Sequence, residues 1–389
     1  MAVTAERTAA GALAGLFVAA LALRPQIIAI GPLLPEIQAD LQLSHFAAGL
    51  LSTIPVLCMG AFAPWAGALV HRHGTRAVVG GSLALIAAFG VLRAVVPGAA
   101  ALVLLTVPVG IGMAVAQTVL PVVVKELLPG RPAFATGVYA TGMQVGVAGG
   151  AAVAVPLSLA LGGWQGPLVV ISVVTAAVAA VWLWLTPHEA PGIPTARPRL
   201  PVRSRLAWVL ALAFGLQSMV FYGLGAWLVP AYVERGWSAD EGGLLLTVFA
   251  LVAIPSGFFV LWLADRAGTR RLYLVLASAT LTTGAVGFVL APGGAWAWAV
   301  LTGAAGGVML PLLLTLPVDA ATDPREVGAL AALMLLGGYL LSALSPVLLG
   351  TVRDATGGFT ASLWLIAGFA AALCAISAML TPRRLAALA

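Results

Sequence analysis

Long apolar runs separated by short polar segments make up most of this chain. Each run holds about 20 residues or more, enough for an α-helix to cross roughly 30 Å of hydrocarbon. The pattern predicts an all-α membrane protein with twelve transmembrane helices. The expected spans are residues 11–34, 46–70, 77–96, 101–124, 134–157, 167–186, 207–231, 243–264, 272–291, 296–318, 329–350 and 360–381.

The composition excludes an ordinary soluble domain. Of the 389 residues, 61% are hydrophobic and 8% are charged, and the mean hydropathy is +1.08. The first run is too long for a signal peptide and is interrupted by Arg24, so it is expected to remain as a span. Cys58 and Cys374 lie inside apolar runs and indicate neither a disulfide framework nor a metal site.

The net charge of +6 is explained by topology. If the N-terminus is inside, fifteen Lys and Arg residues fall on inner segments and two, Arg235 and Arg353, on outer loops. This is the positive-inside pattern of a multi-pass protein of the bacterial plasma (inner) membrane with both termini cytoplasmic. Nucleic acid is not an expected partner.

Arg24 is a charge near the middle of the first apolar run, and Pro25 follows it directly. A cation at bilayer depth is costly unless it faces a wet cavity or a partner. Pro25 removes a backbone donor and crowds the carbonyl of Leu21, so it predicts a broken helix. An arginine on a broken helix suggests an anion site. The alternative is that Arg24 snorkels to the interface or braces the helices.

The two halves of the chain repeat. A short basic turn, Arg72 to Arg76, recurs as Arg266 to Arg270. Other short sequence matches between the two halves fall at offsets of 194 to 196 residues. Residues 187–206 between the halves hold prolines and arginines without apolar periodicity. The sequence therefore predicts two pseudo-symmetric six-helix bundles, 1–186 and 207–389, joined by a cytoplasmic linker at 187–206.

This layout and the two Arg-x-Gly-Thr-Arg turns resemble the major facilitator superfamily. A narrower string, from Leu23-Arg24-Pro25 through Gly31-Pro32-Leu-Leu-Pro35 to Phe62-Ala-Pro64, resembles the cyanate-permease and 2-nitroimidazole-transporter branch. Aspartate normally opens the superfamily turn, but here His71 replaces it in the first half. The fourth span lacks the arginine of many proton antiporters, and the fifth lacks the proline after glycine of drug antiporters. These absences disfavour drug–proton antiport.

The resemblance implies a central cavity lined mainly by spans one, four, seven and ten. At cavity depth the candidate substrate-binding residues are polar or aromatic, and interhelical hydrogen bonding or packing is the alternative role for the glutamines and tyrosines. The residues are Arg24, Gln26, Gln117, Gln144, Gln217, Tyr222, Tyr139, Tyr339 and Met309. Candidate gating residues in the two basic turns are Arg72, Gly74, Arg76, Asp265, Arg266, Gly268 and Arg270. Glycines 142, 146 and 149 are expected to allow close packing between moving bundles.

No carboxylate falls at a span midplane; Glu36 and Asp319 come nearest. A buried carboxylate proton carrier is therefore not expected, and uniport, anion exchange or substrate-coupled symport is favoured. Arg93, near the outer end of the third span, is expected to snorkel, or else to serve a route for anions. No Walker loop or zincin motif is present, so neither an enzyme nor a bound metal or cofactor is predicted.

The sequence thus predicts a secondary transporter of a small anionic or nitro-bearing solute, cyanate-like or a related organic anion. The expected mechanism is alternating access, with Arg24 as the main substrate-binding charge. The expected partners are this solute and membrane lipids, and the protein is expected to be a monomer. The alternatives are a multidrug or metabolite efflux protein of the same fold and a membrane sensor that transports nothing.

Overall fold

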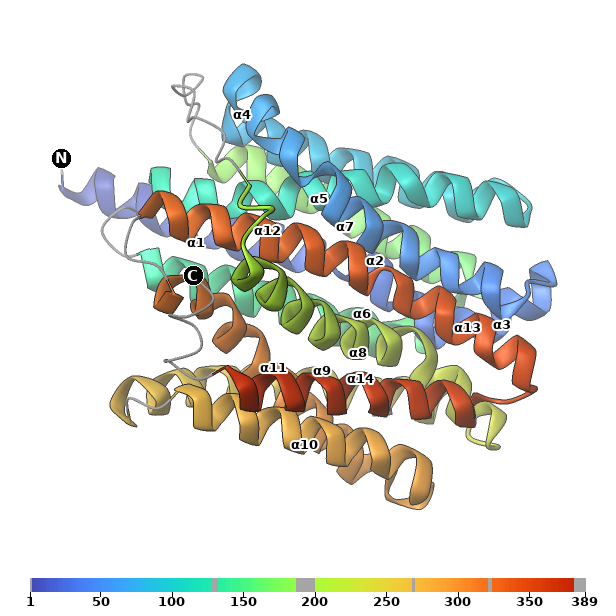
Figure 1. Ribbon diagram of the computed structural model, residues 1–389. Helices are drawn as coiled ribbons and strands as arrows, with labels where there is room; N and C mark the ends of the chain where they lie inside the picture. The colour runs from blue at the N-terminus through green and yellow to red at the C-terminus, as the bar shows by residue number, and fades with distance from the viewer. Residues whose placement is uncertain (1, 128–131, 187–199, 268–269, 321–323, 381–389) are drawn as a thin grey trace. The chain divides into compact units, whose positions relative to one another are not determined.

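The computed structural model describes residues 2–127, 132–186, 200–267, 270–320 and 324–380 (Figure 1). Within these ranges twelve helices are long and apolar enough to cross a membrane, as the hydropathy pattern predicts. Large apolar side chains such as Trp184, Leu159 and Leu104 are exposed, which suits a surface that faces lipid.

The helices follow one another with short connections. They are α1 (Ala2–Ala22), α2 (Pro25–Ile28), α3 (Ile30–Leu41), α4 (His45–Val95), α5 (Ala99–Leu127), α6 (Pro132–Leu161), α7 (Gln165–Leu185), α8 (Arg205–Glu234), α9 (Ala239–Ala267), α10 (Arg270–Leu290), the short 3₁₀ helix η1 (Pro292–Gly294), α11 (Ala295–Ala320), α12 (Pro324–Ser342), α13 (Leu344–Thr356) and α14 (Phe359–Met379).

The first span consists of three helices, because it breaks at Leu23–Arg24 and again at Ala29. Pro25 is the first residue of α2, a position at which its missing N–H costs little. The predicted break is confirmed. The span continues to Leu41 in α3, beyond the predicted end at Leu34, and ends where Gln42 adopts a left-handed conformation with φ of 51°.

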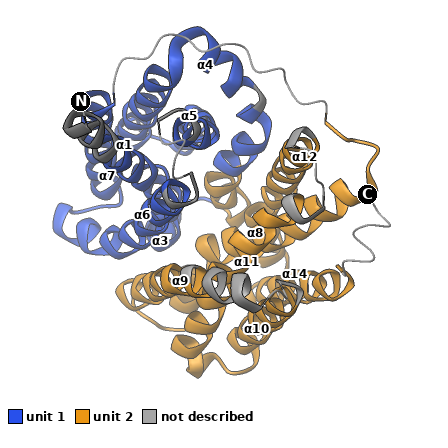
Figure 2. Ribbon diagram, turned by 90° about the vertical axis from the view of Figure 1, so that its left-hand side faces the viewer, with its two compact units in different colours: residues 1–43, 54–195 blue, residues 44–53, 196–389 orange. Residues whose placement is uncertain are grey.

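The chain forms two compact units (Figure 2). Unit 1 comprises residues 1–43 and 54–195, and unit 2 comprises residues 44–53 and 196–389. The first turns of α4 are therefore grouped with unit 2, and the rest of α4 belongs to unit 1. Helix α4 also runs through spans two and three, which meet at Gly74. There φ is 77°, a conformation that favours glycine because it has no Cβ.

The two units share one internal pattern. In unit 1 the first span packs on the fifth, as α1 against α6, and in unit 2 the seventh packs on the eleventh, as α8 against α12. Unit 2 also pairs α9 with α11 and α10 with α14. The pairing of the first span with the fifth in unit 1 thus matches that of the seventh with the eleventh in unit 2.

Close packing of α1 on α6 depends on glycines one helical turn apart. A Cβ at Gly142 or Gly146 would lie under 3.0 Å from the main-chain oxygen of Phe17 or Leu21, respectively. Each glycine thus lets the two backbones approach more closely than any side chain would allow.

The expected role of Gly149 in this packing is wrong. A Cβ there would meet nothing within 4 Å, whereas one at Gly150 would lie 2.8 Å from Cα of Pro25. The spacing of four residues from Gly142 and Gly146 continues to Gly150, which keeps all three on one face of α6. These contacts lie inside unit 1, so the glycines serve packing within the first bundle.

Candidate functional site around Arg24

Arg24 lies at the break between α1 and α2, where it is the N-cap residue of α2. Its side chain is buried, with 9% of the residue exposed. The guanidinium donates a hydrogen bond of 3.1 Å from Nη2 to Oε1 of Gln117 on α5, and Nη1 lies 3.8 Å from Sδ of Met59 on α4. The structure therefore brings together Arg24 and Gln117, two of the predicted substrate-binding residues.

This arrangement suits a planar acceptor. A guanidinium offers five N–H donors in a fixed fork, and one of them makes the hydrogen bond to the amide oxygen of Gln117. A carboxylate, nitro or nitrate group presents two oxygens in one plane and matches this fork. The half-buried Gln117 can add its amide group to the same ligand.

Gln26, the second candidate on this segment, is placed elsewhere. It is 0% exposed, and its Nε2 donates to Oγ of Ser172 on α7 at 2.8 Å. Its Oε1 accepts from Nη2 of Arg93 at 2.6 Å. The side chain of Gln26 is thus engaged with α4 and α7 inside unit 1.

The expectation that Arg93 snorkels is wrong. Arg93 is 0% exposed, and its guanidinium points inward to the first span. Nη2 donates to the main-chain oxygen of Gln26 at 2.7 Å as well as to its Oε1, and Nη1 donates to Oγ1 of Thr106 at 3.3 Å. Nε has no hydrogen-bond partner among the described residues. A position near the end of a span suggests snorkelling, but helix packing here turns the side chain into the protein.

A glycine makes room for this network. A Cβ at Gly90, one turn before Arg93, would lie under 3.0 Å from both Oγ of Ser172 and Nε2 of Gln26. Together with Gly150, which approaches Pro25, Gly90 allows α4, α6 and α7 to enclose α2. The short helix that follows Arg24 is therefore fixed from three sides.

The other candidates of unit 1 lie on α6. Gln144 and Tyr139 are both half-buried, and Gln144 makes no hydrogen bond to a described residue. Their part in substrate binding stays a prediction.

The candidates of unit 2 are mostly buried. Met309 is 0% exposed and belongs to the apolar core, and Gln217 accepts a hydrogen bond from Oγ of Ser218 at 3.3 Å. Buried Tyr222 packs its ring against that of Phe221, with centroids 5.2 Å apart.

Tyr339 on α12 is also buried, and its ring lies edge-on to that of Phe214, with centroids 5.2 Å apart. The part of Tyr222 and Tyr339 in substrate binding stays a prediction.

With this geometry in hand, comparison with known proteins identifies the family. The sequence profile of the Major Facilitator Superfamily matches residues 13–346 and 210–388. The chain belongs to the major facilitator superfamily. This membership agrees with the twelve spans and with the resemblance of the basic turns.

Curated relatives of this superfamily member include transporters of small nitrogen-containing solutes. It is 30% identical over 360 residues to the 2-nitroimidazole transporter of Escherichia coli (strain K12), with 91% of each chain covered. It is 30% identical over 368 residues to the cyanate transport protein CynX of the same strain, with 94% of each covered. A probable nitrate/nitrite transporter, NarK2 of Mycobacterium tuberculosis (strain ATCC 25618 / H37Rv), is 28% identical over 375 residues, covering 90% of this chain and 91% of that one.

Solved structures of the superfamily share the fold. A bacterial homolog of the human lysosomal transporter Spinster, in an inward-facing and unoccupied conformation, aligns with a TM-score of 0.71 at 18% identity, covering 98% of this chain and 94% of the other. At these identities the likeness establishes the fold alone.

The first superfamily turn is fixed by contacts inside unit 1. Arg76 donates from Nε and Nη2 to the main-chain oxygen of Leu183, and Trp182 donates from Nε1 to the oxygen of Arg76 at 3.0 Å. Arg72 is exposed. In the second turn Asp265 and Arg266 lie in the last turn of α9 and Arg270 begins α10, while Gly268 lies outside the described residues.

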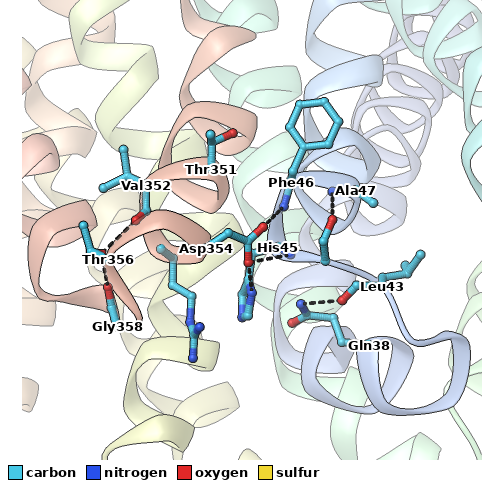
Figure 3. A network of polar contacts seen from close by, with 12 residues as sticks. Gln38, Leu43, His45, Phe46, Ala47, Thr351, Val352, Asp354, Thr356 and Gly358 are labelled. Carbon is cyan, nitrogen blue, oxygen red and sulfur yellow. Dashed lines mark hydrogen bonds and ion pairs between the residues drawn. The ribbon is translucent and has the colours of Figure 1, made fainter.

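Sequence reasoning missed a polar cluster at the start of α4 (Figure 3). The carboxylate of Asp354 on α13 accepts hydrogen bonds from the main-chain nitrogens of His45 and Phe46 at 3.2 and 2.9 Å. It also lies 2.6 Å from Nδ1 of His45. Asp354 thus caps a helix that begins 309 residues earlier in the chain. No local motif signals such a contact.

Proposed function

We propose that this protein moves a small anionic or nitro-bearing solute, cyanate-like or a related small organic anion, across the bacterial plasma membrane by alternating access. Arg24 is the main substrate-binding charge in this proposal. The observation that carries it is a buried guanidinium at a helix break, joined to the amide of Gln117 on another span. Buried cations in membrane segments are costly and serve function by default.

The relatives support the solute class. Their names specify 2-nitroimidazole, cyanate and nitrate or nitrite. Nitro and nitrate groups share a planar pair of oxygens, and cyanate is a small anion that can accept hydrogen bonds at both ends. One fork-shaped cation beside a neutral amide can bind all of these groups.

Topology and gating complete the proposal. Both termini lie in the cytoplasm in this proposal, which the positive-inside pattern supports, and functional bundles at 1–186 and 207–389 are joined through 187–206. The bundles rock about the site, and the turns Arg72–Arg76 and 265–271 act as the gate on the cytoplasmic side. Lipids surround a monomer.

The test measures binding and flux on the same samples. Purified protein in liposomes is assayed for uptake of cyanate, nitrate and 2-nitroimidazole. A charge-assisted hydrogen bond is worth about 1.5–3 kcal/mol net. Arg24→Lys, which loses the fork, should therefore weaken binding roughly ten- to a hundred-fold, and Arg24→Ala should abolish it while the protein remains folded. Arg235→Lys is the matched control, because Arg235 donates to the main chain of Phe288 in unit 2.

The alternatives give different results. If Arg24 only braces the helices, Arg24→Ala lowers the melting temperature and the surviving protein binds with unchanged affinity. Binding without flux indicates a sensor, and flux of larger drugs without flux of the small anions indicates an efflux protein.

A further inference from the structure

We propose that Arg93 is a specificity-determining residue. It supplies a second, fully buried positive charge, held only by neutral groups, that makes the Arg24 site favour anions over uncharged solutes of the same shape. This inference rests on the proposed function, because it requires that substrate binds at Arg24.

The contacts of Arg93 contain no counter-charge. Its acceptors are the main-chain oxygen and Oε1 of Gln26 and the hydroxyl of Thr106, all of which are neutral. Within the described part of the chain no carboxylate lies at ion-pair distance from it. One nitrogen, Nε, is buried without any acceptor there.

Such a residue is expensive as a structural brace. Arginine is almost never fully buried unless it is paired, since the cost of burying a charge is offset only by a partner. An uncharged glutamine or methionine could fill this volume without that penalty. The charge itself therefore calls for an explanation, and an anionic substrate nearby supplies the missing counter-charge.

The position of Arg93 suits this role. It holds Gln26, which lies two residues after Arg24 on the same short segment. An anion bound at Arg24 is thus on the order of 10 Å from Arg93. At that distance the positive charge of Arg93 attracts the anion, because the protein interior screens charge less than water does. Glu36 is the next carboxylate along this segment, and the helical rise places it roughly 15 Å from Gln26. It accepts a hydrogen bond from Ser158, so it does not pair with Arg93.

One substitution separates charge from bracing. Gln26→Glu keeps the size and the hydrogen-bond acceptor of residue 26 but places a negative charge against Nη2 of Arg93. The neighbouring hydroxyl of Ser172, which now donates to the main chain of Leu168, can turn to donate to the new carboxylate. Gln38→Glu is the matched control, because Gln38 lies on α3 of the same span and donates to the main chain of Leu43.

The experiment compares two probes on the full-length protein. Nitrate is the anion, and 1-methyl-2-nitroimidazole, which has no ring proton to lose, is the uncharged solute. The readouts are the ratio of their affinities and the melting temperature without ligand. Gln26→Glu should shift the ratio against nitrate by about tenfold and raise the ligand-free melting temperature by about 2 °C or more, because it pairs a buried charge. Arg93→Gln should shift the ratio in the same direction, and Gln38→Glu should change neither readout.

The inference is overturned if Gln26→Glu folds with an unchanged affinity ratio, or if it lowers the ligand-free melting temperature, since the charge of Arg93 would then be balanced already. The melting measurement decides the second point even if neither probe binds. Failure of the proposed function is distinct: in that case Arg24→Ala leaves the binding of both probes unchanged.

Discussion

The cap that Asp354 forms on α4 allows a quantitative prediction about opening. Residues 44–53 are grouped with unit 2 while the rest of α4 belongs to unit 1. We therefore expect the contacts of its first turns to change when the protein changes conformation. Alternating access requires such contacts to break on one side of the membrane in each cycle. The proposed topology places this end of α4 outside.

The magnitude follows from the hydrogen bonds. Asp354 satisfies two of the first four main-chain N–H groups of α4, which have no partner within the helix. Loss of a helix cap costs about 0.5–2 kcal/mol, and loss of a negative charge at a helix N-terminus costs about 0.3–1 kcal/mol. The contact with the ring of His45 is half-exposed and adds little. Asp354→Ala should therefore favour opening by about 1–3 kcal/mol, or roughly 5- to 150-fold.

The helix itself should survive this change. Ser44 accepts a hydrogen bond at its Oγ from the main-chain nitrogen of Ala47 at 3.2 Å and so provides a local cap. A second contact of α4 also remains: Oγ1 of Thr53 donates a hydrogen bond of 2.8 Å to the main-chain oxygen of Ala343, between α12 and α13. The substitution thus weakens the closed contact without unfolding either helix.

Cysteine labelling measures the opening. In a background that lacks Cys58 and Cys374, a single cysteine replaces Ala48, which is buried at the start of α4. Its rate of modification by a membrane-impermeant maleimide should rise with the open population in Asp354→Ala and by less in Asp354→Asn, which keeps an oxygen acceptor. Asp240→Asn, at an exposed residue on α9, controls for the loss of charge. A folded Asp354→Ala protein that labels at the unaltered rate would refute the reasoning.

Two further predictions concern packing and coupling. Gly146→Ala should destabilise the protein by about 1–3 kcal/mol, because its Cβ would overlap the main chain of Leu21. Gly149→Ala, the control, should be neutral or slightly stabilising. Equal melting temperatures of the two variants would contradict this prediction. Transport should persist in Glu36→Gln and Asp319→Asn, since neither residue falls at a span midplane where a proton could exchange with substrate. Loss of proton-driven flux in either variant would show that a carboxylate carries the proton.

The sequence predicted those features that local chemistry determines. Twelve spans follow from hydropathy, and the break after Arg24 follows from Pro25 alone. Ser44, directly before α4, caps that helix through its Oγ, and this is a local contact of the same kind. Asp40, shortly before α4, accepts a hydrogen bond from Nε1 of Trp164 at 2.9 Å. The partner of Asp40 depends on how α3 packs in unit 1, which a local motif does not contain.

The features that were missed depend on helix rotation and long-range contact. Arg93 and Gly149 were misplaced because the pattern of a nearly all-apolar helix does not show which face is inside. Asp354 was missed because its partners precede it by 308 and 309 residues. In a membrane helix, depth can be read from the sequence with fair accuracy, whereas orientation requires the packed structure.

The surroundings of α2 bear on how substrate drives conformational change. Arg93 and Gly90 from α4, Gly150 from α6 and Ser172 from α7 fix the turn that carries Arg24 within unit 1. If Arg24 moved alone, the turn would lose the hydrogen bonds that the buried guanidinium of Arg93 makes to Gln26. Each of these bonds to a charged group contributes about 1.5–3 kcal/mol. We therefore expect Arg24 to move together with unit 1 instead of swinging toward a bound anion. Substrate can then shift the equilibrium only through contacts that differ between the open and closed states. Under the proposed function we therefore expect selectivity to depend on a rigid site around Arg24, and movement to depend on contacts such as that of Asp354 with α4.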